Sequence, residues 1–246
     1  MPRLIDLHCH LIPGVDDGPA NGLEAGELLD RIKRTMPRPS VVFATPHMRL
    51  SHGARRLAFL EGRFEDFLRS APASGDGGLL LGASVEVMLD GYPFRSRDAD
   101  ALCYPGTNWI LVEVPPRLPW FVAFRRVDEV SRKGFRPLLA HPERYRFHLR
   151  RGAMEKLVRS GAALQVSTRS LASADESLRE SAWAILLSGW CSVLASDCHS
   201  ARDPLLPESE AEVTARMGRD AWIALGSLNP ERILAGQAVE PVRAGA

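Results

Sequence analysis

The sequence lacks any apolar run long enough to span a membrane, and neither sign of charge dominates it. No stretch approaches about 18 consecutive apolar residues, and the first residues turn polar before the apolar segment of a signal peptide could form. Lysine and arginine number 31 against 30 acidic residues, so no overall field attracts nucleic acid or an anionic membrane. We therefore expect a cytoplasmic protein that binds no nucleic acid and inserts into no membrane.

Cysteine is scarce as well. The chain has 4 cysteines, and no two of them form a C-x-x-C motif, so a zinc ribbon or a dithiol redox pair is not expected. None is followed six residues later by arginine, the spacing that cysteine-dependent phosphatase chemistry needs. We expect free, mostly buried thiols with no catalytic role.

What the sequence has in quantity is apolar material in short runs. Hydrophobic residues make up 45% of the 246 residues, which is enough for a sizeable core. Helical spacing at 55–70, 120–133 and 176–188, the last with Asp175 as a candidate N-cap, alternates with runs typical of buried strands. The strand-like runs are 4–8, 41–46, 79–87, 109–114, 137–140, 163–166 and 192–195.

This alternation predicts parallel strands joined by crossover helices. Seven such units suit an α/β fold of the (β/α) barrel type, slightly short of eight strands, in a single domain over residues 1–246. A doubly wound open sheet is the structural alternative.

Histidine and carboxylate side chains gather at the ends of these runs. His8 and His10 lie two residues apart at the end of the first run, so in a strand both side chains point to the same side and can ligate one metal. Glu113 ends an apolar run, where a carboxylate is costly to bury without a partner cation. The carboxyl ends of the strands of a parallel barrel share one face, so these side chains are expected to converge. The set is His8, His10, His47, Glu86, Glu113, His141, Asp197 and His199, with Asp16 or Asp17 in the turn after His10.

Each of these residues alone has an ordinary structural explanation. An exposed pair of histidines, a capped polar residue or a structural salt bridge accounts for any one of them. Together, five histidines and four carboxylates exceed what one zinc ion needs. A mixed nitrogen and oxygen set of this size is typical of two or three divalent ions bridged by carboxylate and water, and manganese, iron and zinc all fit it.

These residues lie in motifs that resemble those of PHP-domain (polymerase and histidinol phosphatase) proteins. Within that superfamily, the chain is similar to the bacterial tyrosine-protein phosphatases of the CpsB/YwqE type, which act in capsular and exopolysaccharide operons. The Asp-Asp-Gly-Pro turn at 16–19 and the His-Pro-Glu-Arg-Tyr string at 141–145 are specific to this branch. The other matching motifs include Ile5-Asp6-Leu7-His8-Cys9-His10, Ala44-Thr45-Pro46-His47, Val85-Glu86-Val87 and Ala195-Ser196-Asp197-Cys198-His199.

The resemblance implies a distorted seven-stranded (β/α) barrel, similar to a TIM barrel, with a multinuclear metal site. Manganese is the expected metal, with iron or zinc as alternatives. Arg144 matches the family's phosphate-contacting arginine and is the implied catalytic and substrate-binding residue, Glu113 is the implied bridging carboxylate, and Arg202 is a further candidate for substrate binding. The implied metal ligands are His8, His10, Asp17, His47, Glu86, Glu113, His141, Asp197 and His199.

The implied reaction is hydrolysis of a phosphate monoester on a phosphotyrosine protein, expected to be a bacterial tyrosine kinase of polysaccharide biosynthesis. A PHP phosphatase acting on small esters, such as histidinol phosphate or a nucleotide, is the alternative, because it shares every metal ligand. A non-enzymatic scaffold for a tyrosine kinase is a third hypothesis, which the complete ligand set argues against. The sequence leaves the oligomeric state open.

Overall fold

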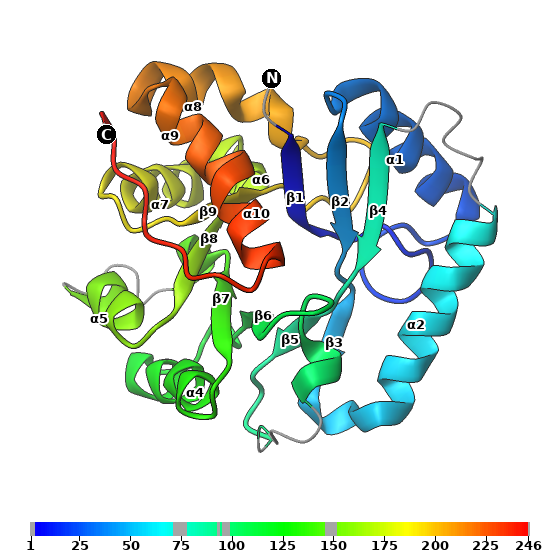
Figure 1. Cartoon of the computed structure of the whole chain (residues 1–246), viewed down its shortest axis with the longest axis horizontal. Coiled ribbons are helices and arrows are strands. Elements are labelled where there is room, and N and C mark those ends of the chain that lie inside the picture. Colours follow the sequence, from blue (N-terminus) through cyan, green and yellow to red (C-terminus); the bar gives the residue numbers. More distant parts are fainter. Residues whose placement is uncertain (1–2, 71–77, 93, 95–98, 146–151, 246) are drawn as a thin grey trace.

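The described strands all run parallel to their hydrogen-bonded neighbours (Figure 1). The computed structural model describes residues 3–70, 78–92, 94, 99–145 and 152–245. One sheet has the strand order β1 (Leu4–Cys9), β2 (Ser40–Ala44), β4 (Leu79–Ala83). The other has the order β3 (His47–Arg49), β5 (Glu86–Met88), β6 (Trp109–Glu113), β7 (Arg136–Ala140), β8 (Ala163–Ser167), β9 (Val193–Ala195). The prediction of an α/β fold with parallel strands is confirmed.

Two of the seven predicted strands are interrupted, and this changes the sheet. The run 41–46 forms β2 only as far as Ala44, and a separate short strand, β3, begins at His47, beyond the predicted run. The run 79–87 divides into β4 and β5, with Ser84 between them. Proline has no N–H to give to a strand ladder. Two backbone bonds still cross the break, from Ser84 N–H to the carbonyl of Ala44 (3.0 Å) and from Glu86 N–H to the carbonyl of Pro46 (3.1 Å). The described strands therefore form sheets of three and six strands, and their pairing does not give the single seven-stranded barrel that we expected.

Helices cover the outer sides of the strands, with α1 and α2 beside the smaller sheet and α4, α5 and α7 beside the larger one (Figure 1). The Asp175 side chain caps α7 as predicted, accepting backbone hydrogen bonds from Ser177 (3.0 Å) and Leu178 (3.3 Å). No helix in the described parts of the chain is both long and apolar enough to cross a membrane. The helices are α1 (Gly22–Thr35), α2 (Gly53–Ser70), α4 (Trp120–Arg132), η3 (Pro142–Arg144), α5 (Ala153–Arg159), α6 (Thr168–Leu171), α7 (Glu176–Leu187), α8 (Glu210–Met217), α9 (Arg219–Ile223) and α10 (Asn229–Leu234), with short 3-10 turns at Leu50–His52, Asp100–Leu102 and Leu206–Ser209 and a π-helical turn at Ala224–Leu228.

Alternate strand residues form two apolar cores. In β6, Trp109 and Leu111 belong to an inner core, whereas Ile110 and Val112 belong to an outer core that the helices share. Glu113 continues the inner face of β6 beyond Leu111, because side chains alternate along a strand. Along β6, the inner-core side chains therefore come first and the polar side chain of Glu113 follows at the carboxyl end of the strand. Its other members are Ile5, Leu7, Val41, Phe43, Tyr104, Leu138, Ala140, Ala163, Val193 and Ile233.

Candidate metal centre

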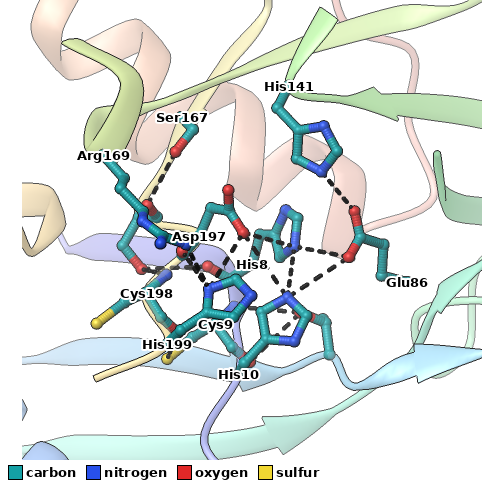
Figure 2. Close-up of polar contacts among 12 residues, drawn as sticks. His8, Cys9, His10, Glu86, His141, Ser167, Arg169, Asp197, Cys198 and His199 are labelled. Atoms are coloured by element: carbon teal, nitrogen blue, oxygen red, sulfur yellow. Dashed lines mark hydrogen bonds and ion pairs between the residues drawn. The ribbon is translucent and has the colours of Figure 1, made fainter. Parts of the chain in front are cut away.

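The nine side chains predicted as metal ligands converge on one centre, although His47 and Glu86 begin β3 and β5 rather than ending a strand. They form four overlapping groups, and within each group the possible ligand atoms all lie within 4.8 Å of one another. Figure 2 shows the side chains of His8, His10, Glu86, His141, Asp197 and His199 gathered around a common centre. The groups are His10, Asp17, His47 and His199; His8, His10 and Asp197; His8, Glu86 and His141; and His47, Glu86 and Glu113.

The first strand brings His8 and His10 to the same side, as strand alternation predicts. Their Nε2 atoms are 3.2 Å apart, and the intervening Cys9 belongs to the outer core. The register of β1 shifts between Asp6 and Cys9. Such an irregularity re-aims side chains, so that His8 joins the cluster directly after the inner-core residue Leu7.

The second ring nitrogen of each of these histidines also has a partner. His8 Nδ1 lies 2.9 Å from Gln165 Oε1, and His10 Nδ1 lies 2.8 Å from Asp16 Oδ2. An acceptor at Nδ1 keeps the hydrogen there and leaves the lone pair of Nε2 facing the centre. Sequence reasoning did not select Gln165; its place on the inner face of β8, among apolar neighbours, is the signal that could have found it.

The turn after His10 gives its two aspartates different positions. Asp16 faces inward, where it accepts hydrogen bonds from His10 and from the backbone N–H groups of Gly18 (3.0 Å) and His47 (3.1 Å). Burial opposes the charge on Asp16, but these hydrogen bonds outweigh it and lower its pKa to about 2. Asp17 Oδ1 instead lies 3.3 Å from His47 Nε2 and 3.3 Å from His199 Nε2. Asp17 is therefore the candidate ligand of the two, and Asp16 contacts the outer ring nitrogen of His10.

Glu86 occupies the middle of the cluster. Its Oε1 is 2.7 Å from His141 Nε2, and its Oε2 is 2.9 Å from His47 Nδ1 and 3.3 Å from His8 Nε2. Burial opposes its charge, yet the surrounding imidazoles hold its pKa well below the ordinary range. Glu86 belongs to two of the four groups and Glu113 to one. Glu86 is therefore better placed than Glu113 to be shared by two neighbouring candidate cation sites.

Carboxylates around His10 and His47 favour the protonated forms of these two imidazoles. Burial opposes the charge of His10, but contacts with Asp16 and Glu86 outweigh it and raise its pKa to about 10. For His47, burial is outweighed by the contacts with Glu113 and Glu86, and the pKa rises to about 11. A cation that binds these nitrogens must displace their protons.

Two residues of the cluster have left-handed backbone conformations. His141, directly after β7, has φ +33°, and Asp197, just after β9, has φ +55°. Non-glycine residues in this region cost about 1–3 kcal/mol each and persist only where the surroundings hold them. The Tyr145 hydroxyl, 3.3 Å from His141 Nδ1, and the bond from Asp197 N–H to the His8 carbonyl (2.8 Å) do so here.

The cluster contains buried polar atoms that lack a hydrogen bond of acceptable geometry among the described residues. Buried polar groups are normally paired, so a set of such atoms around one centre is the pattern expected of a cation site. Nitrogen and oxygen donors without a thiolate suit manganese, iron or zinc. The cluster atoms without such a hydrogen bond are His47 Nδ1, Glu86 Oε2, Glu113 Oε1 and Asp197 Oδ1. Their contacts with one another and with His8 are ion pairs at 2.9, 3.0 and 3.4 Å.

Arginine side chains lie at the edge of this centre. Arg144, on the turn after β7, directs Nη2 at the carboxylate of Asp197, and its side chain is 30% exposed. Burial opposes its charge, but Asp197 and Glu143 raise the pKa of Arg144 above its ordinary value. Arg202 is exposed, and no contact among the described residues joins its guanidinium to the cluster. Sequence reasoning missed Arg169, whose Nη1 lies 3.0 Å from His199 Nδ1.

Comparison with known proteins gives this centre a family context. Residues 4–235 match the family model described as capsular polysaccharide synthesis, CpsB/CapC. The chain belongs to the CpsB/CapC family. Tyrosine-protein phosphatase YwqE of Bacillus subtilis (strain 168) is 27% identical over 203 residues, which cover 81% of this chain and 78% of YwqE.

Solved structures share the fold of this chain. A structure from the study of YwqE from Bacillus subtilis and CpsB from Streptococcus pneumoniae, which are described as metal-dependent tyrosine phosphatases, matches with a TM-score of 0.74 at 23% identity, covering 99% of this chain and 100% of the other. Dihydropyrimidinase from Brevibacillus agri NCHU1002 matches with a TM-score of 0.53 at 10% identity, covering 100% of this chain and 74% of its own. At these identities the likeness concerns the fold alone.

The cysteines of this family member are all free and buried, as the sequence predicted. Cys9 and Cys198 alternate with metal-site residues in the chain, yet both belong to the outer core. The Cys198 thiol donates to the carbonyl of Ser200 (3.2 Å). Burial in such surroundings keeps a thiol inert, so neither position is suited to a nucleophile.

Proposed function

We propose that this chain is a metal-dependent tyrosine phosphatase of capsular or exopolysaccharide synthesis. The observation that carries the proposal is the convergence of nine nitrogen and oxygen donors on one centre, with buried atoms left without hydrogen bonds. Membership of the CpsB/CapC family supports the reaction class, because the relative YwqE bears the name of a tyrosine-protein phosphatase. The same comparisons favour this activity over hydrolysis of small phosphate esters, the alternative considered from the sequence.

Two or three divalent ions, manganese first, are proposed for the four overlapping donor groups. Bound there, they supply positive charge against the phosphoryl oxygens and lower the pKa of water. The chain's own part is to fix the donors. Gln165 and Asp16 set the ring orientations of His8 and His10, and Arg144 holds one carboxylate oxygen of Asp197.

Arg144 is proposed to bind the phosphoryl group as well. Its guanidinium is partly exposed beside the donors, and a planar fork of N–H groups pairs with two phosphoryl oxygens at once. A tyrosine leaving group has a pKa of about 10, so it departs with less proton donation than an alkoxide needs. We infer that the physiological substrate is a phosphotyrosine protein, namely a bacterial tyrosine kinase. The enzyme and this substrate are proposed to interact in the cytoplasm.

The test combines metal analysis with substrate choice. We expect the purified protein to carry two or three transition-metal ions and to hydrolyse a phosphotyrosyl peptide with a higher kcat/KM than histidinol phosphate or a nucleotide. Chelation should abolish activity, and manganese should restore it. At most one ion per active chain would contradict the multinuclear site, and a preference for the small esters would contradict the substrate.

A matched pair of variants ties the activity to the cluster. Glu86→Gln keeps the shape of the buried carboxylate and removes its charge, so metal content and rate should both fall by at least about 10-fold. Glu155→Gln makes the same change on α5, where the side chain is 41% exposed in a surface ion pair with Arg159, and should leave both unchanged.

A further inference from the structure

Arg169 reaches the candidate centre from a different element than Arg144 does. It lies on α6, which begins directly after β8. Its Nη1 is 3.0 Å from His199 Nδ1, and its Nε is 3.5 Å from Asp203 Oδ1 (Figure 2). The side chain is 39% exposed, so the guanidinium borders both the cluster and the solvent.

Asp203 contacts both Arg169 and the backbone of the His199 loop. The second oxygen of Asp203 accepts the backbone N–H groups of His199 (2.9 Å) and Ser200 (2.9 Å). The same aspartate therefore holds the His199 loop and one edge of the guanidinium. Pre-organised donors of this kind lose little freedom when they bind an anion.

The contact between Arg169 and His199 changes when His199 ligates a cation. His199 Nδ1 also lies 2.9 Å from the carbonyl of Asp197, and it can either donate to this carbonyl or accept from Arg169. When Nε2 is a ligand, the ring hydrogen must sit on Nδ1, which then donates to the carbonyl. Arg169 Nη1 is left with an N–H that has lost its acceptor, at the mouth of the site.

We propose that Arg169 is a substrate-binding residue that donates this N–H to a phosphoryl oxygen. The inference rests on the proposed phosphatase function and extends it. Arg144 and Arg169 approach the segment Asp197–His199 from two different elements, η3 and α6. A phosphate ester bound by both guanidiniums would receive two charge-assisted donors, which suits the dianion of a phosphotyrosine side chain.

A positioning role is the competing explanation, because Arg169 touches a candidate ligand. If Arg169 served only to hold the His199 ring, its removal would weaken metal binding and leave phosphate affinity unchanged in the loaded protein. Two readouts therefore separate the roles: metal content per chain, and affinity for inorganic phosphate measured at saturating manganese.

The experiment uses Arg169→Met, which keeps an apolar stem, together with Arg169→Lys. Arg159→Met is the matched control, since Arg159 forms a surface ion pair with Glu155 and its side chain is 79% exposed. Calorimetric titration of the manganese-loaded proteins with inorganic phosphate gives Kd, and p-nitrophenyl phosphate gives kcat and KM. We expect Arg169→Met to raise Kd by about 10-fold to 100-fold, the range for a charge-assisted hydrogen bond, with unchanged metal content. Arg169→Lys should recover part of the loss.

Either of two results overturns the proposal. A Kd within twofold of wild type removes Arg169 from the binding site, and lost metal with unchanged phosphate affinity assigns it to positioning. Failure of the proposed function looks different, because the wild type itself would then fail to hydrolyse the aryl ester.

Discussion

Replacing Arg144 with alanine tests whether this arginine serves the substrate or only the metal site. The change removes a guanidinium that contacts the carboxylate of Asp197 and is 30% exposed. Two consequences follow from the structure: a phosphoryl group loses one charged donor, and a buried carboxylate loses one partner. They predict different measurements.

The first consequence should dominate the rate. Loss of one pre-organised donor to the transition state typically costs about 10²–10³ in rate, or about 2.7–4 kcal/mol. The second is smaller than the roughly 3–5 kcal/mol of an abandoned buried charge, because Asp197 Oδ1 remains 3.4 Å from His8 Nε2 and 3.7 Å from His10 Nε2. Burial opposes the charge of Asp197, yet His8 and Arg144 together lower its pKa to about 2. Without Arg144 the imidazoles still favour the ionised carboxylate.

The assay is kcat/KM for an aryl phosphate and a phosphotyrosyl peptide at saturating manganese, with metal content measured on the same samples. We expect Arg144→Ala to lower kcat/KM by about 10²–10³ with metal content near wild type, and Arg144→Lys to recover part of it, because an ammonium cannot copy the planar fork. Arg159→Ala, on the surface of α5, is the control. Activity within twofold of wild type at saturating manganese would refute the substrate role. If the same variant were impaired at limiting manganese, Arg144 would act only through Asp197.

Three further outcomes follow from the site. Asp16→Asn removes the charge that orients the ring of His10, and a metal titration should show affinity lower by about 10–100-fold; unchanged affinity would count against that orienting role. Cys9→Ser and Cys198→Ser should retain activity, because both thiols lie in the core, whereas loss of activity with intact metal content would reinstate a cysteine mechanism. In chelated protein, the pKa values of His10 and His47, raised from 6.5 to about 10 and about 11, stabilise the fold fully below pH 6.5, and this stability is lost as pH rises through those values. The urea concentration at the unfolding midpoint of chelated protein should therefore decrease as the pH is raised from about 7 to about 10. A midpoint that does not change with pH would contradict these pKa shifts.

The order of strands and helices was accessible from the sequence because burial on both faces leaves continuous apolar runs. The strand breaks at Pro46 and Ser84 could not be predicted, because they depend on how neighbouring strands pair around these residues. The helix α1 was also missed. Its start is signalled by Asn21, whose side chain accepts backbone hydrogen bonds from Leu23 (3.0 Å) and Glu24 (3.1 Å), a capping pattern that the sequence does contain.

Candidate ligands were accessible for a different reason. Strand ends in a parallel α/β fold meet at one edge, so side chains as far apart in the chain as His8 and His199 could be placed together from the alternation of strands and helices alone. Their orienting partners could not be placed in this way. Neither Gln165 nor Arg169 was selected as a site residue, because their roles follow from which ring nitrogen they face, which only the packing of the folded chain decides.

The two strained residues show how donors just beyond a strand reach the shared centre. A strand places successive side chains on opposite faces, so one strand supplies at most alternate residues to a shared centre. The left-handed turns at His141 (φ +33°) and Asp197 (φ +55°) end that alternation at once and re-aim the next side chains. This lets His141 meet Glu86 within 2.7 Å and places Asp197 beside His8 and Arg144. At these two positions the backbone adopts a conformation that non-glycine residues disfavour. Such conflicts between local preference and the global fold are expected at functional sites.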